Sequence, residues 1–236
     1  MTSRLESRSG QYSGLVLLGL AAGLIITLMP VPGQGQAGPG ALTITRLHYG
    51  GGGDWYADPS SLPNLIAYTR KQTGIRIVPE EVRAAIGDDT FRGSTYLYLT
   101  GHGNIHFTDE EAVLLRSHLI AGAFLHADDN YGMDRAFRRE MKEVFPDKDW
   151  VELPPDHSIF NIVFPFPEGL PKIHEHDGKR SQGLGLFHEG RLIVFYTYEC
   201  DLGDGWEDPQ VHDVVPQLRE AALKMGANII TYALSR

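Results

Sequence analysis

Residues 121–141 combine a β-strand, a tight turn and an α-helix in direct succession. A short apolar run, 123–127, ends at the adjacent carboxylates Asp128 and Asp129, and helical spacing of apolar residues resumes at Met133. In an open α/β sheet, a turn of this kind lies at the carboxyl end of a strand, where ligands bind. The sequence therefore predicts an α/β fold with a site at the turn after this strand.

The rest of the chain repeats the alternation of strand and helix. Turns rich in Gly and Asp separate alternating apolar runs from segments with helical spacing. The proline-rich run 146–171 is expected at an edge of the sheet or over the site. Together these signals predict one α/β domain, 41–236, in which helices cover both faces of a mostly parallel sheet. The expected strands are 42–49, 75–78, 95–100, 123–127, the hairpin 183–198 and 229–234, and the expected helices are 61–73, 79–82, 108–120, 133–144 and 210–225.

The first 37 residues have the composition of an export signal. Two arginines precede an apolar run, 15–29, and residues 35–37 offer small side chains to a signal peptidase. Segment 13–30 also approaches the ~18 residues at which a membrane-spanning helix becomes possible. The short apolar core and the small-residue exit favour a cleaved signal over a retained membrane anchor. In both cases the body is expected outside the inner membrane, either periplasmic or anchored by residues 13–30.

Charge and cysteine content argue against several partners and reactions. The chain carries 21 Lys and Arg against 30 Asp and Glu, a formal net charge of −9. This balance argues against nucleic acid, and against membrane contact other than through the N-terminal segment. Cys200 is the single cysteine, so no intrachain disulfide is possible. Because it lies outside any nucleophile-elbow motif, we expect a small buried side chain rather than a nucleophile.

Polar residues recur where the predicted strands end. Four loops are concerned: 50–56, 100–104, 128–129 and 199–208. Because parallel strands place their carboxyl ends on one edge of the sheet, several of these loops should converge there. Gly and Asp are also ordinary turn residues, which is the alternative for any single loop. The residues expected to bind a ligand are Asp54, Trp55, Tyr131, Asp134, Arg138, His157, Glu199, Asp201 and Trp206.

The candidate catalytic residues are Asp128, Asp129 and His102. One of two adjacent carboxylates can titrate high beside its charged neighbour and act as an acid or a base, or the pair can ligate a hard cation. Neighbouring strand residues point to opposite faces, however, which favours only one of them entering the cleft. The other would cap the next helix or pair with Arg135 or Arg138. His102 stands between two glycines, which allow close backbone approach to a ligand.

A divalent metal is a candidate cofactor, and the sequence offers two ligand sets for it. His174 and His176 share one face if the chain is extended, a spacing compatible with a transition metal, although such a pair is usually part of a plain surface strand. The acidic loop after the hairpin loosely resembles a calcium loop without following the EF-hand order. Its residues are Asp201, Asp204, Glu207 and Asp208.

Five motifs carry a family resemblance: residues 51–56, 98–103, 127–141, 153–157 and 203–208. Together they resemble the domain of unknown function family 4159 over residues 42–234. The resemblance implies a bacterial cell-envelope protein and brings no established activity with it.

More distantly, the order of elements and the segment around Asp156 and His157 resemble ThuA-like trehalose-utilisation proteins. That resemblance implies a three-layer sandwich of the flavodoxin-like, class I glutamine amidotransferase-like type. The cysteine elbow of the amidotransferases corresponds to residues 127–129, where this chain has carboxylates. Amidotransfer through a Cys-His-Glu triad is therefore not expected.

Three functions stay open on these grounds. The first is an exported binding module that holds a polar, carbohydrate-like ligand in a cleft at the carboxyl edge of the sheet. The second is a hydrolase that uses Asp128 or Asp129 as base, helped by His102 or His157, with or without a divalent metal. The third is an inactive envelope-assembly module with a protein partner. Aromatic and acidic residues in the same loops, and the missing nucleophile motif, favour the first.

Overall fold

The computed structural model describes residues 40–235. The export signal or anchor predicted for residues 1–37 lies outside this range. Within it, no helix is both long and apolar enough to cross a membrane. The described strands form a seven-stranded sheet in the order β2-β1-β3-β4-β7-β6-β5. Their bounds are β1 Ile44–His48, β2 Val82–Ala85, β3 Tyr96–Leu99, β4 Phe124–Asp128, β5 Val151–Glu152, β6 Gln182–His188 and β7 Arg191–Tyr198.

Most of this sheet is parallel. Strands β2, β1, β3, β4 and β7 pair in parallel, whereas β6 pairs antiparallel with both β7 and β5. The predicted α/β fold with a mostly parallel sheet is thus confirmed, and so is the hairpin predicted over residues 183–198. The proline-rich run supplies the edge strand β5, as expected.

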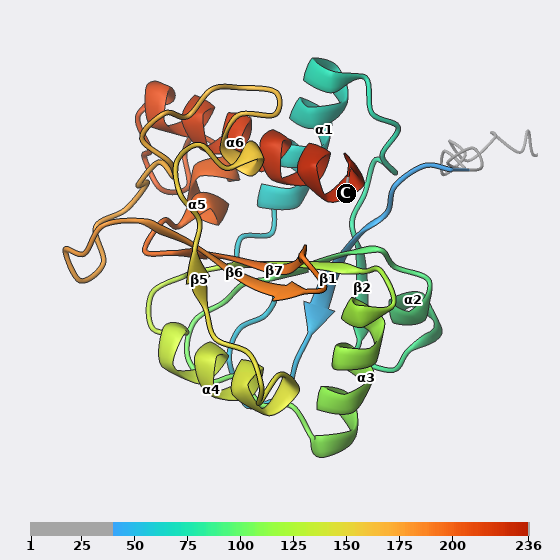
Figure 1. Cartoon of the computed structure of the whole chain (residues 1–236). Helices are drawn as coiled ribbons and strands as arrows, with labels where there is room; N and C mark the ends of the chain where they lie inside the picture. The colour runs from blue at the N-terminus through green and yellow to red at the C-terminus, as the bar shows by residue number, and fades with distance from the viewer. Residues whose placement is uncertain (1–39, 236) are drawn as a thin grey trace, which may run out of the picture. The chain divides into compact units, whose positions relative to one another are not determined.

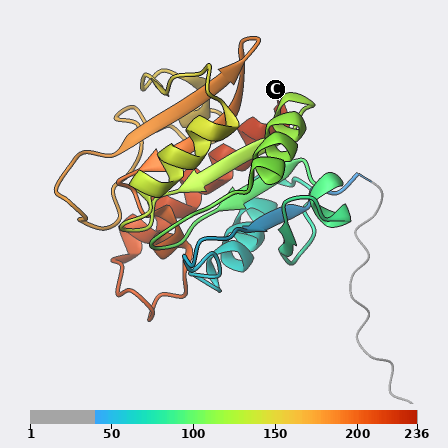
Figure 2. The same ribbon diagram turned by 90° about the horizontal axis from the view of Figure 1, so that it is seen from below.

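Helices cover both faces of the sheet (Figure 1). Helices α1, α5 and α6 contact one another on one face, and α3 contacts α4 on the other. Figure 2 shows α3 and α4 side by side across that second face. The bounds are α1 Ser61–Thr73, α2 Asp89–Arg92, α3 Asp109–Ile120, α4 Asp134–Val144, the 3₁₀ turn η1 Ser158–Phe160, α5 Leu202–Trp206 and α6 Pro216–Ser235.

Strand β3 shows how one strand serves two apolar layers. Side chains alternate between the faces of a sheet. Tyr96 and Tyr98 therefore join the core under α1 and α6, while Leu97 and Leu99 join the core under α3 and α4. All four are buried. A strand buried on both faces is typical of a parallel sheet covered by helices.

The helix signals near residues 108 and 133 are confirmed. The Thr108 hydroxyl accepts a hydrogen bond from the Glu111 backbone N–H at 3.2 Å, and the Glu111 carboxylate accepts from the Thr108 N–H at 2.8 Å. This reciprocal capping box satisfies two donors that the first turn of α3 would otherwise leave unpaired. The strand, turn and helix expected over 121–141 appear as β4, the turn and α4.

The predicted final strand, 229–234, is wrong, because α6 continues unbroken to Ser235. Gly226 does not end the helix predicted over 210–225. A Cβ at this position would lie 2.4 Å from the Leu65 side chain and 2.9 Å from Trp206. The glycine therefore reflects close packing of α6 against α1 and α5, rather than a helix end.

The predictions between residues 75 and 82 are also wrong. The expected strand 75–78 forms only an isolated bridge, between Ile77 and Leu42, and the expected helical turn 79–82 is not a helix. The strand here is β2, an edge strand of which only Ala84 is buried. An edge strand needs little apolar surface, so its sequence signal is weak.

Candidate functional site

The polar loops predicted to converge do meet at the carboxyl edge of the parallel strands. The loop after β1 contacts the loop after β3 through the Gly53 N–H, which donates to the Asn104 carbonyl at 2.9 Å. It contacts the turn after β4 through Asn130, whose amide donates to the Asp58 carboxylate at 3.0 Å. Residues far apart in sequence are therefore brought together at one place.

Asp128 ends β4 and is completely buried. One carboxylate oxygen accepts from the Thr197 hydroxyl at 2.5 Å and from the Leu202 N–H at 3.3 Å, and the other accepts from the Gly203 N–H at 2.6 Å. Burial, and then the charge of Asp201, raise its pKa to about 8. Because its oxygens face the first turn of α5, Asp128 holds that helix in place behind the surface of the site.

Three acidic residues around the site adopt backbone angles that side chains rarely accept. Asp58, Glu199 and Asp201 have positive φ values of 55°, 58° and 56°. A left-handed backbone at a residue other than glycine costs free energy, and such residues cluster at functional sites. Here the conformation places Asp201 directly before α5, which also carries Asp204.

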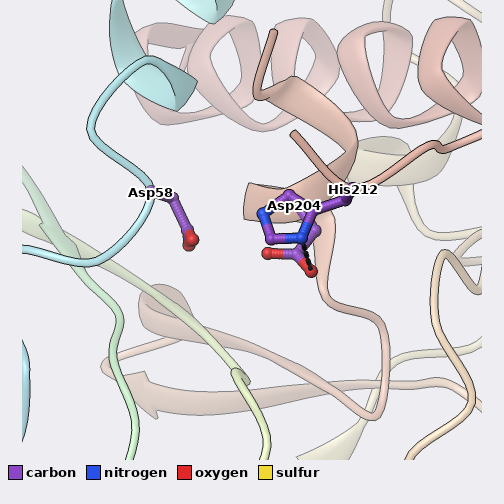
Figure 3. A group of neighbouring side chains, drawn as sticks. All are labelled: Asp58, Asp204 and His212. Atoms are coloured by element: carbon purple, nitrogen blue, oxygen red, sulfur yellow. Dashed lines mark ion pairs between the residues drawn. The ribbon is translucent and has the colours of Figure 1, made fainter. Parts of the chain in front are cut away.

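A cluster of histidines and carboxylates forms around Asp204. Its Oδ2 atom lies 2.7 Å from His174 Nδ1 and 3.3 Å from His212 Nδ1. Asp201 Oδ2 lies 3.4 Å from His174 Nδ1 and 3.0 Å from His176 Nε2. Figure 3 shows Asp58 across from Asp204 and His212, on the loop before α1. We call His174, His176, Asp201, Asp204, His212 and Asp58 the His/Asp cluster.

The His/Asp cluster contains two overlapping sets of ligand atoms. Asp204 belongs to both, once with His174 and Asp201 and once with Asp58 and His212, and within each set the atoms lie within 4.8 Å of one another. Imidazole nitrogen and carboxylate oxygen are the donors that zinc and other divalent transition metals use in proteins. The cluster is therefore able to hold such an ion.

The carboxylates of the cluster crowd one another in a buried place. Burial, and then the charges of Asp201, Asp58 and Asp128, raise the pKa of Asp204 to about 9. Burial also raises the pKa of Asp58. Burial raises the pKa of Asp201, but hydrogen bonds with His174 and His176 outweigh it and leave this pKa lower than usual. Among residues 40–235, no Lys or Arg forms an ion pair with Asp58, Asp128, Asp201 or Asp204, and the ion pairs of Asp201 and Asp204 are with histidines.

An open hollow of about 520 Å³ lies over the His/Asp cluster. His102 borders it from the loop after β3. The Asp54 carboxylate lies 3.1 Å from His102 Nδ1 and also accepts from the His102 backbone N–H. Asp54 thereby fixes the ring through Nδ1 and leaves Nε2 as the nitrogen available to a substrate. The residues that border the hollow are His102, Tyr131, His174, Glu175, His176, Asp201, Asp204 and His212.

Asp129 borders a second hollow of about 290 Å³, beside the first. Its Oδ2 accepts from the Glu199 N–H at 2.9 Å. Tyr131 and His176 border both hollows. Of the two adjacent carboxylates, Asp129 thus borders a hollow while Asp128 faces α5.

Several other candidate residues have structural contacts instead. Trp206 is fully buried, and its indole N–H donates to the Ala222 carbonyl at 2.8 Å, so no ligand reaches its ring. His157 caps η1 and packs against Tyr232, away from the carboxyl edge of the sheet. Trp55 stacks on His48, with ring centroids 4.4 Å apart.

The remaining charged candidates pair among themselves. Arg138 pairs with Asp134 at 2.6 Å rather than with either carboxylate of the β4 turn. Glu207 accepts from the Ser60 N–H at 2.6 Å, and Asp208 accepts from Asn64 at 2.9 Å. Both therefore anchor the start of α1, so the loosely predicted calcium loop does not form as one ligand set.

Asp58 and His212 are residues of the cluster that the sequence did not single out as ligands. Asp58 precedes Pro59 and the start of α1, where an Asp is ordinarily a helix-entry residue. His212 follows α5 in a segment without any metal-binding spacing. The packing of α5 against α1 brings Asp58 close to Asp204. His212 reaches Asp204 from the segment that follows α5.

A known protein family matches the part of the chain that forms the carboxyl edge of the sheet. No curated protein matches the chain. The family described as "Domain of unknown function (DUF4159)" matches residues 43–234, which include every residue of the His/Asp cluster. The chain belongs to this family.

Proposed function

We propose that the chain binds a divalent transition-metal ion in the His/Asp cluster and uses it to hydrolyse a polar substrate. The observation that carries this proposal is the set formed by His174, Asp201 and Asp204, whose donor atoms lie within 4.8 Å of one another. The two carboxylates of the set are buried, and a bound cation would favour their ionised forms, which burial alone disfavours.

The donor types and the exposure of the cluster support a catalytic rather than a structural ion. Nitrogen and oxygen donors suit zinc, manganese or iron better than magnesium or calcium, which prefer oxygen alone. The side chains of His174 and His212 are 33% and 30% exposed, and both border the large hollow. Catalytic metal sites keep such an open side for water and substrate, whereas structural sites are closed.

The surrounding residues supply the other parts of a hydrolytic site. A divalent ion held by the cluster would polarise a carbonyl or phosphoryl oxygen and lower the pKa of a nearby water. His102, held through Nδ1 by Asp54, borders the same hollow and is suited to accept a proton at Nε2 and return it to the leaving group. Asp128 and Asp54 act as positioning residues.

Asp128 stands at the end of β4, where the amidotransferases that share the fold of ThuA-like proteins carry a cysteine. Its two oxygens already accept hydrogen bonds from Thr197 and Gly203. This arrangement favours metal-assisted chemistry over a covalent nucleophile. The predicted export signal would place the reaction in the cell envelope.

A second candidate is a binding module for a carbohydrate-like ligand without catalysis. It is favoured by Tyr131, an aromatic side chain that is 56% exposed and borders both hollows. Aromatic faces of this kind pack well against sugar rings. Because Trp206 is buried and Trp55 stacks on His48, Tyr131 is the aromatic residue on which this candidate depends.

Metal analysis of the purified chain tests the proposal. The wild type is expected to hold metal in stoichiometric amount, and chelation should lower its melting temperature because the ion binds the folded state. Asp201→Asn and His174→Ala should each lose most of the metal. His188→Ala is the matched control, since it removes a histidine from the opposite end of the sheet. A wild type that takes up neither zinc, manganese nor iron would overturn the proposal.

A further inference from the structure

Asp129, which borders the smaller hollow, carries a buried oxygen atom without a hydrogen-bond partner. Asp129 is only 2% exposed. Its Oδ2 accepts from the Glu199 N–H at 2.9 Å, whereas Oδ1 has no partner among the described residues. The nearby Tyr196 hydroxyl donates its single proton to Asp134 at 3.1 Å. A buried acceptor left unpaired is costly, and where one borders a hollow it indicates a ligand that donates.

The other carboxylates around this hollow already have cationic partners. Asp134 pairs with Arg138 at 2.6 Å, Glu199 with Lys172 at 3.1 Å, and Asp177 with Lys179 at 3.4 Å. Among the carboxylates that border the hollow, Asp129 alone forms no ion pair with a described Lys or Arg. Arg135 and Lys179 also border the hollow, but neither forms an ion pair with Asp129, so a ligand can supply the cationic partner of this carboxylate.

We propose that this hollow is a subsite for the protonated primary amine of a polar, hydroxylated substrate, with Asp129 Oδ1 accepting a hydrogen bond from the ammonium group. A carboxylate prefers a cationic donor to a neutral one, because a charge-assisted hydrogen bond is about twice as strong. A volume of about 290 Å³ matches a single small group or sugar ring.

The subsite lies next to the His/Asp cluster. Tyr131 and His176 border both hollows, and the Tyr131 ring meets the His176 ring edge-on at 5.4 Å. One substrate can therefore place its amine against Asp129 and its scissile bond over the cluster. This inference deepens the proposed function. It rests on that function in one respect, which is that the amine belongs to the substrate of the metal site.

Binding of small amines to the full chain tests the subsite. D-Glucosamine and ethanolamine serve as ammonium probes, and D-glucose and ethylene glycol as their hydroxyl counterparts. Ligand-observed NMR titrations are expected to show at least one amine binding about tenfold more tightly than its counterpart. Two amines that bind no better than their counterparts would overturn the subsite. This comparison needs only the wild type, so it holds even if a variant fails to fold.

Two variants assign the selectivity to a residue. Asp129→Asn keeps the size of the side chain and removes its charge, and is expected to weaken amine binding about tenfold. Asp177→Asn removes a carboxylate of the same hollow that already pairs with Lys179, and should leave amine binding within about twofold. A folded Asp129→Asn variant with unchanged amine selectivity would overturn the proposal.

Repeating the titrations after chelation separates this inference from the proposed function. Amine selectivity in a chain that never holds metal would leave the subsite standing and remove the metal-dependent hydrolase. A chain that holds metal but shows no preference for amines would remove the subsite alone.

Discussion

The Asp128 carboxylate accepts a hydrogen bond from the Gly203 backbone N–H at 2.6 Å. This bond joins the end of β4 to the first turn of α5, the helix that carries Asp204. Both partners of this hydrogen bond are buried, so losing it would leave a buried polar group unpaired, which is costly. The position of Asp204 relative to the sheet therefore depends on Asp128, which borders neither of the two hollows.

Gly203→Ala is expected to disturb the His/Asp cluster. A Cβ at this position would lie 2.7 Å from Asp58 Oδ2, which is closer than Cβ atoms approach other atoms, and 3.2 Å from Asp128 Oδ2, which is a tight contact. We expect a loss of roughly 1 to 3 kcal/mol in the free energy of unfolding, because a crowded core must shift. Metal content should fall as well, since Asp58 and Asp204 move apart.

Gly93→Ala is the matched control for this variant. The new Cβ would lie 3.7 Å from the nearest atom, the Asp89 carbonyl oxygen, which is an ordinary contact. Urea unfolding and elemental analysis measure both variants. If Gly203→Ala is as stable and as metal-rich as Gly93→Ala, then the tight contact at α5 does not position the cluster.

Arg46→Lys is expected to loosen the loop that carries Asp58. The buried Arg46 guanidinium donates to both oxygens of Glu81 at 3.0 and 3.1 Å, and to the Ala57 carbonyl at 2.7 Å. A lysine cannot reproduce this planar fork, so we expect a loss of roughly 2 to 4 kcal/mol in the free energy of unfolding. Urea unfolding checks the value.

Arg83→Lys provides the comparison on the same carboxylate. Arg83 also pairs with Glu81, at 3.1 Å, but its side chain is 52% exposed. Exposed ion pairs contribute little, so this variant should change the unfolding free energy by less than about 1 kcal/mol. Equal losses of unfolding free energy in Arg46→Lys and Arg83→Lys would show that the ion pair with Glu81 is responsible. The burial of Arg46 under the loop that carries Asp58 would then not be the cause.

The sequence was sufficient for features that depend on local chemistry. The capping box at Thr108, the hairpin and the turn after β4 each follow from neighbouring residues, and all are present. The strand predicted over 229–234 failed because a short apolar run has the same pattern in a strand as in a buried part of a helix. Gly226 strengthened the error, since its role is a contact with Leu65 from a distant helix.

The candidate site was predictable in place but not in composition. Parallel strands bring their carboxyl ends together whatever the loop sequences, so the edge could be located. Which side chain faces a hollow depends on contacts between distant residues, such as Asp128 with Gly203 and Glu207 with Ser60. Asp58 joins the cluster through the packing of α1 against α5, which no local pattern encodes.

His126 is expected to make the chain less stable in acid. Burial lowers the pKa of His126 from 6.5 to about 3, so the folded chain holds this ring neutral. Between these values the unfolded chain binds one more proton than the folded chain. This contribution to stability is present above pH 6.5 and is lost as the pH falls towards the folded pKa, at about 1.4 kcal/mol per pH unit.

Urea unfolding of the wild type and of His126→Gln over this pH range measures the contribution. Glutamine cannot titrate but can still hydrogen-bond to Thr197, which lies 3.2 Å from the His126 ring. The stability advantage of the wild type over the variant should shrink as the pH falls. His188→Gln is the control and should follow the wild type. A constant difference between wild type and His126→Gln would contradict a neutral buried ring.

Asp129 is expected to show the opposite dependence on pH. Burial raises its pKa from 3.8 to about 6, against the hydrogen bond from the Glu199 N–H, and the charge of Asp134 acts in the same direction as burial. The folded chain therefore binds more protons than the unfolded chain between these values. The resulting stability is present below pH 3.8 and is lost as the pH rises through 6.

Asp129→Asn removes this titration and should be more stable than the wild type above pH 6, by up to roughly 3 kcal/mol. The difference should fade as the pH is lowered towards 4. Asp177→Asn, which removes a half-exposed carboxylate on the rim of the same hollow, is the control variant. Urea unfolding at several pH values measures both variants. If Asp129→Asn is less stable than the wild type at every pH, then both oxygens of ionised Asp129 already have hydrogen-bond partners in the folded chain. The hollow would then need no ammonium group.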